Sequence, residues 1–172
     1  MGGVSIATGV IATDATGGGA GRGYQSPGVV AQSGTASSVT GTTSETVLAT
    51  IPIPAGALGI NGVLRITALW SYTNSANNKT LRINFGGTTW FNQVQTTTAS
   101  AQGMTMIRNR GSVTSQVGYA ISAGSAFGST SVANATAAIN MAVAQNLTIT
   151  GTLALGTETI TLEGYTVEIL NP

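Results

Sequence analysis

The chain alternates apolar with polar or small residues along most of its length after residue 44. In the segment 63–72, for example, Leu64, Ile66, Ala68, Trp70 and Tyr72 all fall on one face. A period of two residues is typical of strands with one buried face. The same pattern predicts further strands at 47–53, 81–85, 88–94, 104–108, 117–121, 139–143, 147–155 and 158–170.

Glycines mark two special positions in this pattern. Gly86-Gly87 stands between two alternating runs and predicts a hairpin, because both primed turn types need the positive φ that glycine adopts without strain. In the last predicted strand the apolar residues change parity at Gly164, from Ile160 and Leu162 on one side to residues 165, 167 and 169 on the other. Such a change of parity predicts a β-bulge at Gly164.

About eight strands with Gly- and Asn-rich turns predict an all-β fold, a jelly-roll-like two-sheet sandwich. The sandwich is expected to occupy residues 44–172. Pro52 and Pro54 restrict its first strand to an edge or an end, because proline cannot donate to a sheet ladder. The only helical turn expected is an alanine-rich one at 133–138.

Residues 1–43 are predicted to form an extended N-terminal arm that serves assembly or attachment. They are rich in Gly, Ala, Ser and Thr and have too little apolar surface to offset the entropy of ordering on their own. Short apolar alternations at Val4 with Ile6, and at Val10 with Ala12, suit addition to the sheet edge of a neighbour. The candidate attachment residues are Val4, Ile6, Val10, Arg22 and Tyr24.

The charge content is low and changes the expected partners. Charged residues make up 6% of the chain, against about 25% in typical domains. This favours a subunit covered by copies of itself over a free monomer. The net charge is +1 and the basic residues are dispersed, so no nucleic acid is expected. No apolar stretch approaches the roughly 20 residues that span a bilayer, so no membrane insertion is expected.

The residue inventory argues against an enzyme. The chain has no histidine and no cysteine, which removes Ser-His and Cys-His pairs and histidine zinc sites. Glu158, Glu163 and Glu168 are expected to be solvated strand positions too far apart to act as a catalytic pair. Lys79 is expected in a polar turn without burial. We therefore expect no catalytic residue, no cofactor and no metal ion.

The aromatic residues leave two interpretations open. Trp90 and Phe91 are adjacent, so in a regular strand they point to opposite faces. One is expected in the core, and the other faces solvent, a neighbouring subunit or a ligand. Trp70 is expected in the core. The candidate interface or ligand aromatics are Trp90, Phe91 and Tyr72.

Two stretches of the chain resemble small structural proteins of tailed bacteriophages. They are ETVLATIPIPAGALG at 45–59 and LRITALWSYTNSANNKTLR at 64–82. The segments SQVG at 115–118 and TETITLEGYTVEI at 157–169 are similar too. The resemblance covers roughly residues 45–170. It implies a β-sandwich virion domain, commonly trimeric, with a fibre, decoration or minor tail role.

Two structural functions follow as expectations from the resemblance. The first is a homotrimeric capsid decoration (cement) or head-fibre protein whose arm binds the major capsid protein or another virion protein. The second is a tail fibre or receptor-binding component that contacts host surface glycans. Its polar loops would be 73–79, 111–116 and 124–134. In both cases the protein is assembled in the host cytoplasm and located on the virion surface.

Overall fold

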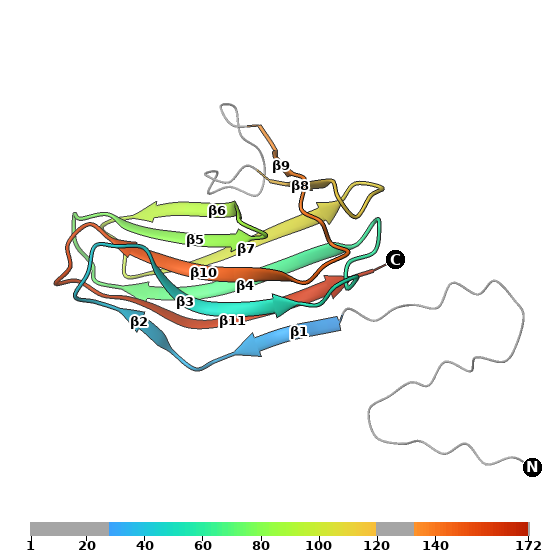
Figure 1. The fold of residues 1–172 in the computed structure, drawn as a ribbon. Helices are drawn as coiled ribbons and strands as arrows, with labels where there is room; N and C mark the ends of the chain where they lie inside the picture. The colour runs from blue at the N-terminus through green and yellow to red at the C-terminus, as the bar shows by residue number, and fades with distance from the viewer. Residues whose placement is uncertain (1–27, 120–132, 172) are drawn as a thin grey trace, which may run out of the picture.

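The structure, a computed structural model, describes residues 28–119 and 133–171 of the chain, and within them it is all β (Figure 1). The strands are β1 (Gly28–Ser33), β2 (Ser37–Val39), β3 (Thr46–Ile53), β4 (Val63–Tyr72), β5 (Lys79–Phe85), β6 (Thr88–Gln95), β7 (Ser100–Asn109), β8 (Gln116–Gly118), β9 (Ala135–Ala137), β10 (Gln145–Leu153) and β11 (Ile160–Leu170).

The strands form two antiparallel sheets that pack as a sandwich. The seven-stranded sheet has the order β1-β11-β4-β7-β8-β9, with β2 also paired to β11. The four-stranded sheet has the order β3-β10-β5-β6. The pairs β2·β11, β3·β10, β4·β7 and β5·β6 are nested. The outermost pair joins the first and last of these strands, and the innermost pair joins two consecutive strands. This nesting is the topology of a jelly roll, so the predicted fold class is confirmed.

The core lies between the sheets and consists of the residues that the alternation assigned to the inner face. Strand burial follows the period of two, most clearly in β4 and β5. Each fully buried aliphatic or aromatic side chain contributes about 1.5–3 kcal/mol. The largest apolar side chains with under 2% exposure are Trp70, Trp90, Phe85, Ile53, Leu58, Leu64, Ile66, Leu81, Ile83, Ile107 and Met141.

Both predictions made from glycines, the hairpin at Gly86-Gly87 and the bulge at Gly164, are confirmed. Gly86 and Gly87 have φ of 55° and 77° and join β5 to β6. The β11·β4 register shifts between Leu162 and Gly164, which returns Val167 to the core. Gly164 does not have a positive φ. Its requirement for glycine comes from β1, since a Cβ there would lie 2.8 Å from the Ser33 carbonyl oxygen.

We predict that Gly164→Val lowers the free energy of unfolding by about 1–3 kcal/mol, the usual cost of forced overpacking. The obstacle is a backbone atom of β1, so the strand itself must shift away from β11. Thermal melting and hydrogen exchange of the β1 amides measure the effect. Gly34→Val is the matched control, because a Cβ at Gly34 meets nothing within 4 Å. Equal melting temperatures for the two variants would contradict the close approach.

The predicted boundary between arm and sandwich at residue 44 is wrong. β1 and β2 pair with β11, so the described sandwich begins at Gly28. The small and β-branched residues of this stretch suit a strand that lies on an existing edge, where Val39 is 4% exposed. Composition alone suggested a chain with nothing to bury, but an edge strand draws its stability from the ladder that it joins.

Two local predictions, for residues 133–138 and 139–143, are also wrong. The expected helical turn at 133–138 contains β9, because the edge of β8 offers a ladder to this short segment. The expected strand at 139–143 is a turn. Its backbone amides form hydrogen bonds outside any strand ladder. The Ile139 amide donates to Gln116 Oε1, and the Met141 amide donates to the Val113 carbonyl. The strand expected at 117–121 is the shorter β8, and residues 120 and 121 lie outside the described residues.

Candidate functional site

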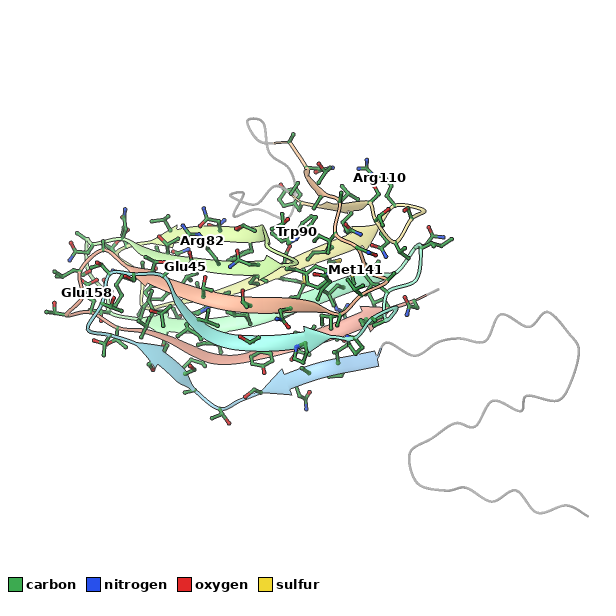
Figure 2. The ribbon with its side chains drawn as sticks, in the orientation of Figure 1. Glu45, Arg82, Trp90, Arg110, Met141 and Glu158 are labelled. Atoms are coloured by element: carbon green, nitrogen blue, oxygen red, sulfur yellow. The ribbon has the colours of Figure 1, made fainter. Side chains whose placement is uncertain are left out.

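A buried charged cluster joins the β4–β5 loop to the segment before β11. Lys79 is fully buried and Glu158 is 6% exposed. Lys79 Nζ lies 3.7 Å from Glu158 Oε2 and donates to Ser75 Oγ at 2.8 Å. The Ser75 hydroxyl donates to Glu158, and Asn77 Nδ2 donates to the same carboxylate oxygen at 2.9 Å. The cluster lies at one end of the sandwich, where Figure 2 labels Glu158.

This cluster corrects two predictions. Lys79 is not a solvated turn residue, and Glu158 is not a solvated strand residue. Lys79 shares parity with Leu81, Ile83 and Phe85, so the strand period extended by one step would have placed it inward. A Ser-Lys pair can activate a hydroxyl nucleophile. Here the Ser75 hydroxyl donates to the Glu158 carboxylate, and the lysine amine is buried away from solvent. The arrangement therefore holds the β4–β5 loop in place.

The remaining described carboxylates are also held by structural partners. Glu168 receives two hydrogen bonds from the Arg65 guanidinium, at 2.6 and 2.7 Å, across β11 and β4. Glu163, at the bulge, accepts a hydrogen bond from Ser71. Glu45 accepts from Arg82 at 2.9 Å and from Thr150 at 2.6 Å on the outer face of the four-stranded sheet (Figure 2). Glu168 and Glu163 thus connect the neighbouring strands β11 and β4, and Glu45 connects the start of β3 to β10 and β5.

We predict that the protein loses stability in acid below pH 4.5. Hydrogen bonds from Asn77 and Ser75, with the Lys79 ammonium, hold the pKa of Glu158 below its ordinary value of 4.5. Hydrogen bonding from Arg65 lowers the pKa of Glu168 in the same way. A lowered folded-state pKa stabilises the protein above the unfolded value, and this stabilisation disappears as the pH falls through the folded value.

Melting temperatures between pH 7 and pH 2 measure this loss. The melting temperature of the variant Glu168→Gln should be lower than that of the wild type at pH 7. It should also fall less steeply between pH 4.5 and pH 2, because only Glu158 remains of the two carboxylates with a lowered pKa. A pH profile that is flat below pH 4.5 in the wild type would contradict the assignment.

The adjacent aromatics Trp90 and Phe91 both pack inward, contrary to the prediction of opposite faces. In the β5·β6 register Ile83 faces Phe91 and Asn84 faces Thr89, so Trp90 is the extra residue of a bulge. Trp90 is 1% exposed. The Phe91 ring stacks on Trp70, with ring centroids 5.7 Å apart and planes 8° apart. The bulge was not visible in the sequence, because no parity change or glycine marks it.

The candidate aromatics therefore do not form an exposed ligand platform. Tyr72 is 7% exposed, and its hydroxyl lies 2.7 Å from Thr98 Oγ1. Trp90 Nε1 donates to the Phe85 carbonyl at 3.4 Å. Phe91 is half-buried beside the core. The structure brings Phe91 and Trp70 together and assigns all of these side chains to packing.

A second buried polar network organises the opposite end of the sandwich. Gln116 is 1% exposed and its Nε2 donates to Asn109 Oδ1 at 2.9 Å. Asn109 Nδ2 donates to the Gly59 carbonyl at 2.8 Å, and Gln116 Oε1 accepts from the Ile139 amide at 2.7 Å. Two side chains on β7 and β8 thus hold the loops that precede β4 and β10. Asn109 shares the inward parity of Thr105 and Ile107, which was the signal available in the sequence.

A hollow of about 270 Å³ lies at this same end, beside β7 and β8. Its lining residues are Arg108, Val117, Gly118, Tyr119 and Asn134. Arg65, Lys79 and Arg82 each have a glutamate partner. Among the described residues Arg108 and Arg110 have no such ion pair. The hollow thus combines an uncompensated guanidinium, a phenol and an amide, groups that suit a hydroxyl-rich or acidic ligand.

Two of the three polar loops of the glycan hypothesis, 73–79 and 111–116, lie far apart. Loop 73–79 follows the end of β4, where Ser71 pairs with Ser100, whereas loop 111–116 follows the end of β7, where Arg108 pairs with Val63. The two loops are therefore at opposite ends of the sandwich. Of the loop 124–134, Asn134 borders the hollow, and residues 124–132 lie outside the described residues.

Several expectations concern parts of the chain or groups that the structure does not describe. The arm candidates Val4, Ile6, Val10, Arg22 and Tyr24 lie outside the described residues. Within residues 28–119 and 133–171, no three acidic, histidine or cysteine side chains gather in a way that could hold a metal ion. No helix of this part of the chain is long and apolar enough to cross a membrane.

Comparisons with known proteins give little beyond the geometry. No protein-family model matches the chain, and no curated protein matches it. Among solved structures, the chain is similar to dimeric latent PorU from Porphyromonas gingivalis, with 10% identity and a TM-score of 0.39 over 88% of this chain. The matched region spans 14% of the length of the PorU chain.

Proposed function

We propose that this protein is a non-enzymatic structural protein of a bacteriophage virion. In this proposal it is a homotrimeric capsid decoration (cement) or head-fibre protein that attaches to the major capsid protein through its N-terminal arm and stabilises the shell. It is assembled in the host cytoplasm and lies on the virion surface.

The observation that carries the proposal is the small number of charged side chains on both outer sheet faces. By register, the outer face of the seven-stranded sheet presents Thr67, Thr166, Leu69 and Met104 around the self-compensated Arg65–Glu168 pair. Met104 is 54% exposed and Leu69 is 45% exposed. Arg108 of β7 shares this face and has no ion pair among the described residues, so burial against protein needs an acidic partner at Arg108 and otherwise leaves few charges to desolvate.

The other face supports the same proposal. The outer face of the four-stranded sheet presents threonines and asparagines around the Arg82–Glu45 pair, which is again compensated within the chain. Wide neutral contacts repeated at every local symmetry axis supply stabilisation through area, and no chemistry is needed. The jelly roll itself is used by viral capsid domains and also by lectins.

The experiment adds the purified full-length chain to capsids that lack it and follows capsid melting by calorimetry. The proposal predicts saturable binding, in multiples of three copies per site, and a higher melting temperature of the shell. Binding to isolated tails but not to capsids would overturn the decoration role.

One observation favours the alternative, a tail fibre or receptor-binding component that contacts host glycans. The hollow lined by Arg108, Tyr119 and Asn134 places a cation, an aromatic ring and an amide together. A glycan array probed with the wild type and with Arg108→Ala tests it. Loss of a wild-type signal in the variant supports the alternative, and absence of any wild-type signal contradicts it.

A further inference from the structure

The outer face of the seven-stranded sheet carries an exposed apolar patch on β4 and β7. Alternate side chains of both strands point away from the core, and the register places Leu69 beside Gln102 and Thr67 beside Met104. Leu69 is 45% exposed and Met104 is 54% exposed. Methionine and arginine are enriched in protein interfaces, and Arg108 lies on the same face.

Two charged side chains with no ion pair among the described residues lie toward opposite ends of this face. Arg108 is exposed on β7, in register with Val63 of β4. Glu163 lies at the bulge of β11, beside Leu69, and accepts a hydrogen bond from the outward-facing Ser71. The ion pairs of the described residues involve other side chains. The face thus carries one positive and one negative charge that are not compensated by a neighbour.

These two charges are too far apart to neutralise each other within one copy. The face extends over six residues of β4 from Val63 to Leu69, which is roughly 20 Å at about 3.4 Å per residue. Salt screens exposed charges over about 8 Å. Burial against a neutral partner would leave both charges unpaired and desolvated, at a high cost. A well-matched partner therefore presents a carboxylate at the Arg108 end and a cation at the Glu163 end.

A second copy of the same face meets this requirement. Two copies stacked face to face are related by a two-fold axis that lies in the interface. An axis that runs across the strands at the level of Ile66, halfway between Val63 and Leu69, reverses the strand direction of the second copy. The Arg108 end of each copy then lies over the Glu163 end of the other, and the apolar patches meet between these ends.

The usual geometry of packed sheets also brings the correct strands together. Arg108 is on β7 and Glu163 is on β11, which flank β4 on its two sides. Sheets that pack face to face have strands that cross at about 30°. A crossing of this size moves β11 of one copy toward β7 of the other, and the long side chains of arginine and glutamate span the remaining offset.

The face is large enough for a stable contact between two copies. Its four adjacent strands β1, β11, β4 and β7 are spaced about 4.8 Å apart, and the ten residues of β4 extend about 34 Å. The face therefore covers roughly 650 Å² on each copy, or about 1,300 Å² for the pair. Stable interfaces bury about 1,200–2,000 Å² in total.

We propose that two copies of the chain bind each other through the outer faces of their seven-stranded sheets, with Arg108 of each copy paired to Glu163 of the other. The contact is isologous, because both copies use the same patch. The inference goes beyond the proposed function: a two-fold contact joins two single chains into a dimer, or two trimers into an assembly of six.

Charge reversal in the full-length chain tests the pairing, with the native mass measured by sedimentation equilibrium. Arg108→Glu and Glu163→Arg each place like charges opposite one another at both ends of the interface. We expect each change to weaken association by about a hundredfold or more and to halve the native mass. An equimolar mixture of the two variants should regain the wild-type mass, because both contacts again join opposite charges. A chain with both changes should regain it for the same reason.

Arg110→Glu is the matched control. Arg110 is exposed just after β7, has no ion pair among the described residues and lies beyond the sheet face, so its reversal should leave the native mass unchanged. Melting temperatures establish that each variant is folded. A folded Arg108→Glu protein with the wild-type mass, or a mixture of variants that stays at half the wild-type mass, would overturn the inference.

The wild-type mass separates this inference from the proposed trimer. Six copies would support both, and two copies would support the two-fold contact while overturning the trimer. Three copies would overturn the inference and leave the trimer intact, which is also the result expected if another virion protein covers the face. A single copy would overturn both.

Discussion

Replacing Trp90 with alanine is expected to lower the free energy of unfolding by about 3–5 kcal/mol, the range measured for large-to-alanine changes in closed cores. The indole is 1% exposed and fills the space between β6 and β8, where a Cβ on Gly118 would come within 2.7 Å of its ring. The surrounding strands are held by their ladders, so the cavity cannot collapse fully. Chemical denaturation measures the loss.

Val94→Ala is the control for this change. Val94 lies on the same strand but is 51% exposed, so its truncation should alter stability by no more than about 0.5 kcal/mol. The comparison also distinguishes the two interpretations of the aromatic residues. A Trp90→Ala protein of normal stability that had lost binding to host cells would contradict the core assignment and support a ligand role.

Lys79→Met is the second change with a large expected effect. The substitution keeps an unbranched chain but removes the ammonium group, and it leaves the carboxylate of Glu158 buried without its cation. Removing one partner of a buried ion pair typically costs about 3–5 kcal/mol. The loss should appear both in the melting temperature and as faster hydrogen exchange in the β4–β5 loop, which the cluster pins.

Two further variants test whether the effect of Lys79→Met comes from leaving a buried carboxylate without its partner or only from losing one charge. The double variant Lys79→Met with Glu158→Gln should recover part of the stability, because no buried charge is left uncompensated. Arg82→Met removes a cation from the exposed pair with Glu45, where the side chains are 30% and 43% exposed, and should cost no more than about 1 kcal/mol. Equal losses for Lys79→Met and Arg82→Met would contradict the buried cluster.

The alternation of apolar residues was sufficient to predict the sandwich. β4, β5, β6, β10 and β11 follow the predicted ranges closely, and in β4 and β5 one face is buried along the whole strand. The hairpin at Gly86 and the bulge at Gly164 were visible since glycine or a parity change marks them. β1, β2 and β9 were not visible, because their stability comes from the ladders of β11 and β8.

The candidate site was less predictable than the fold. Whether a polar side chain is buried depends on what meets it from distant parts of the chain: Glu158 reaches Lys79 across 79 residues of sequence. The bulge at Trp90 turns both adjacent aromatics inward, where one of the two was expected to face outward. The hollow beside Arg108 joins residues from β7, β8 and position 134, which no local pattern connects.

The most direct test of the central proposal is to locate the protein on intact phage particles by cryo-electron microscopy. The proposal predicts trimeric jelly-roll density repeated over the capsid shell, with the chain before β1 continuing into contact with capsid subunits. Density confined to the tail or its tip would contradict the decoration role and favour the glycan-binding alternative. Particles that lack the protein altogether would contradict the virion assignment.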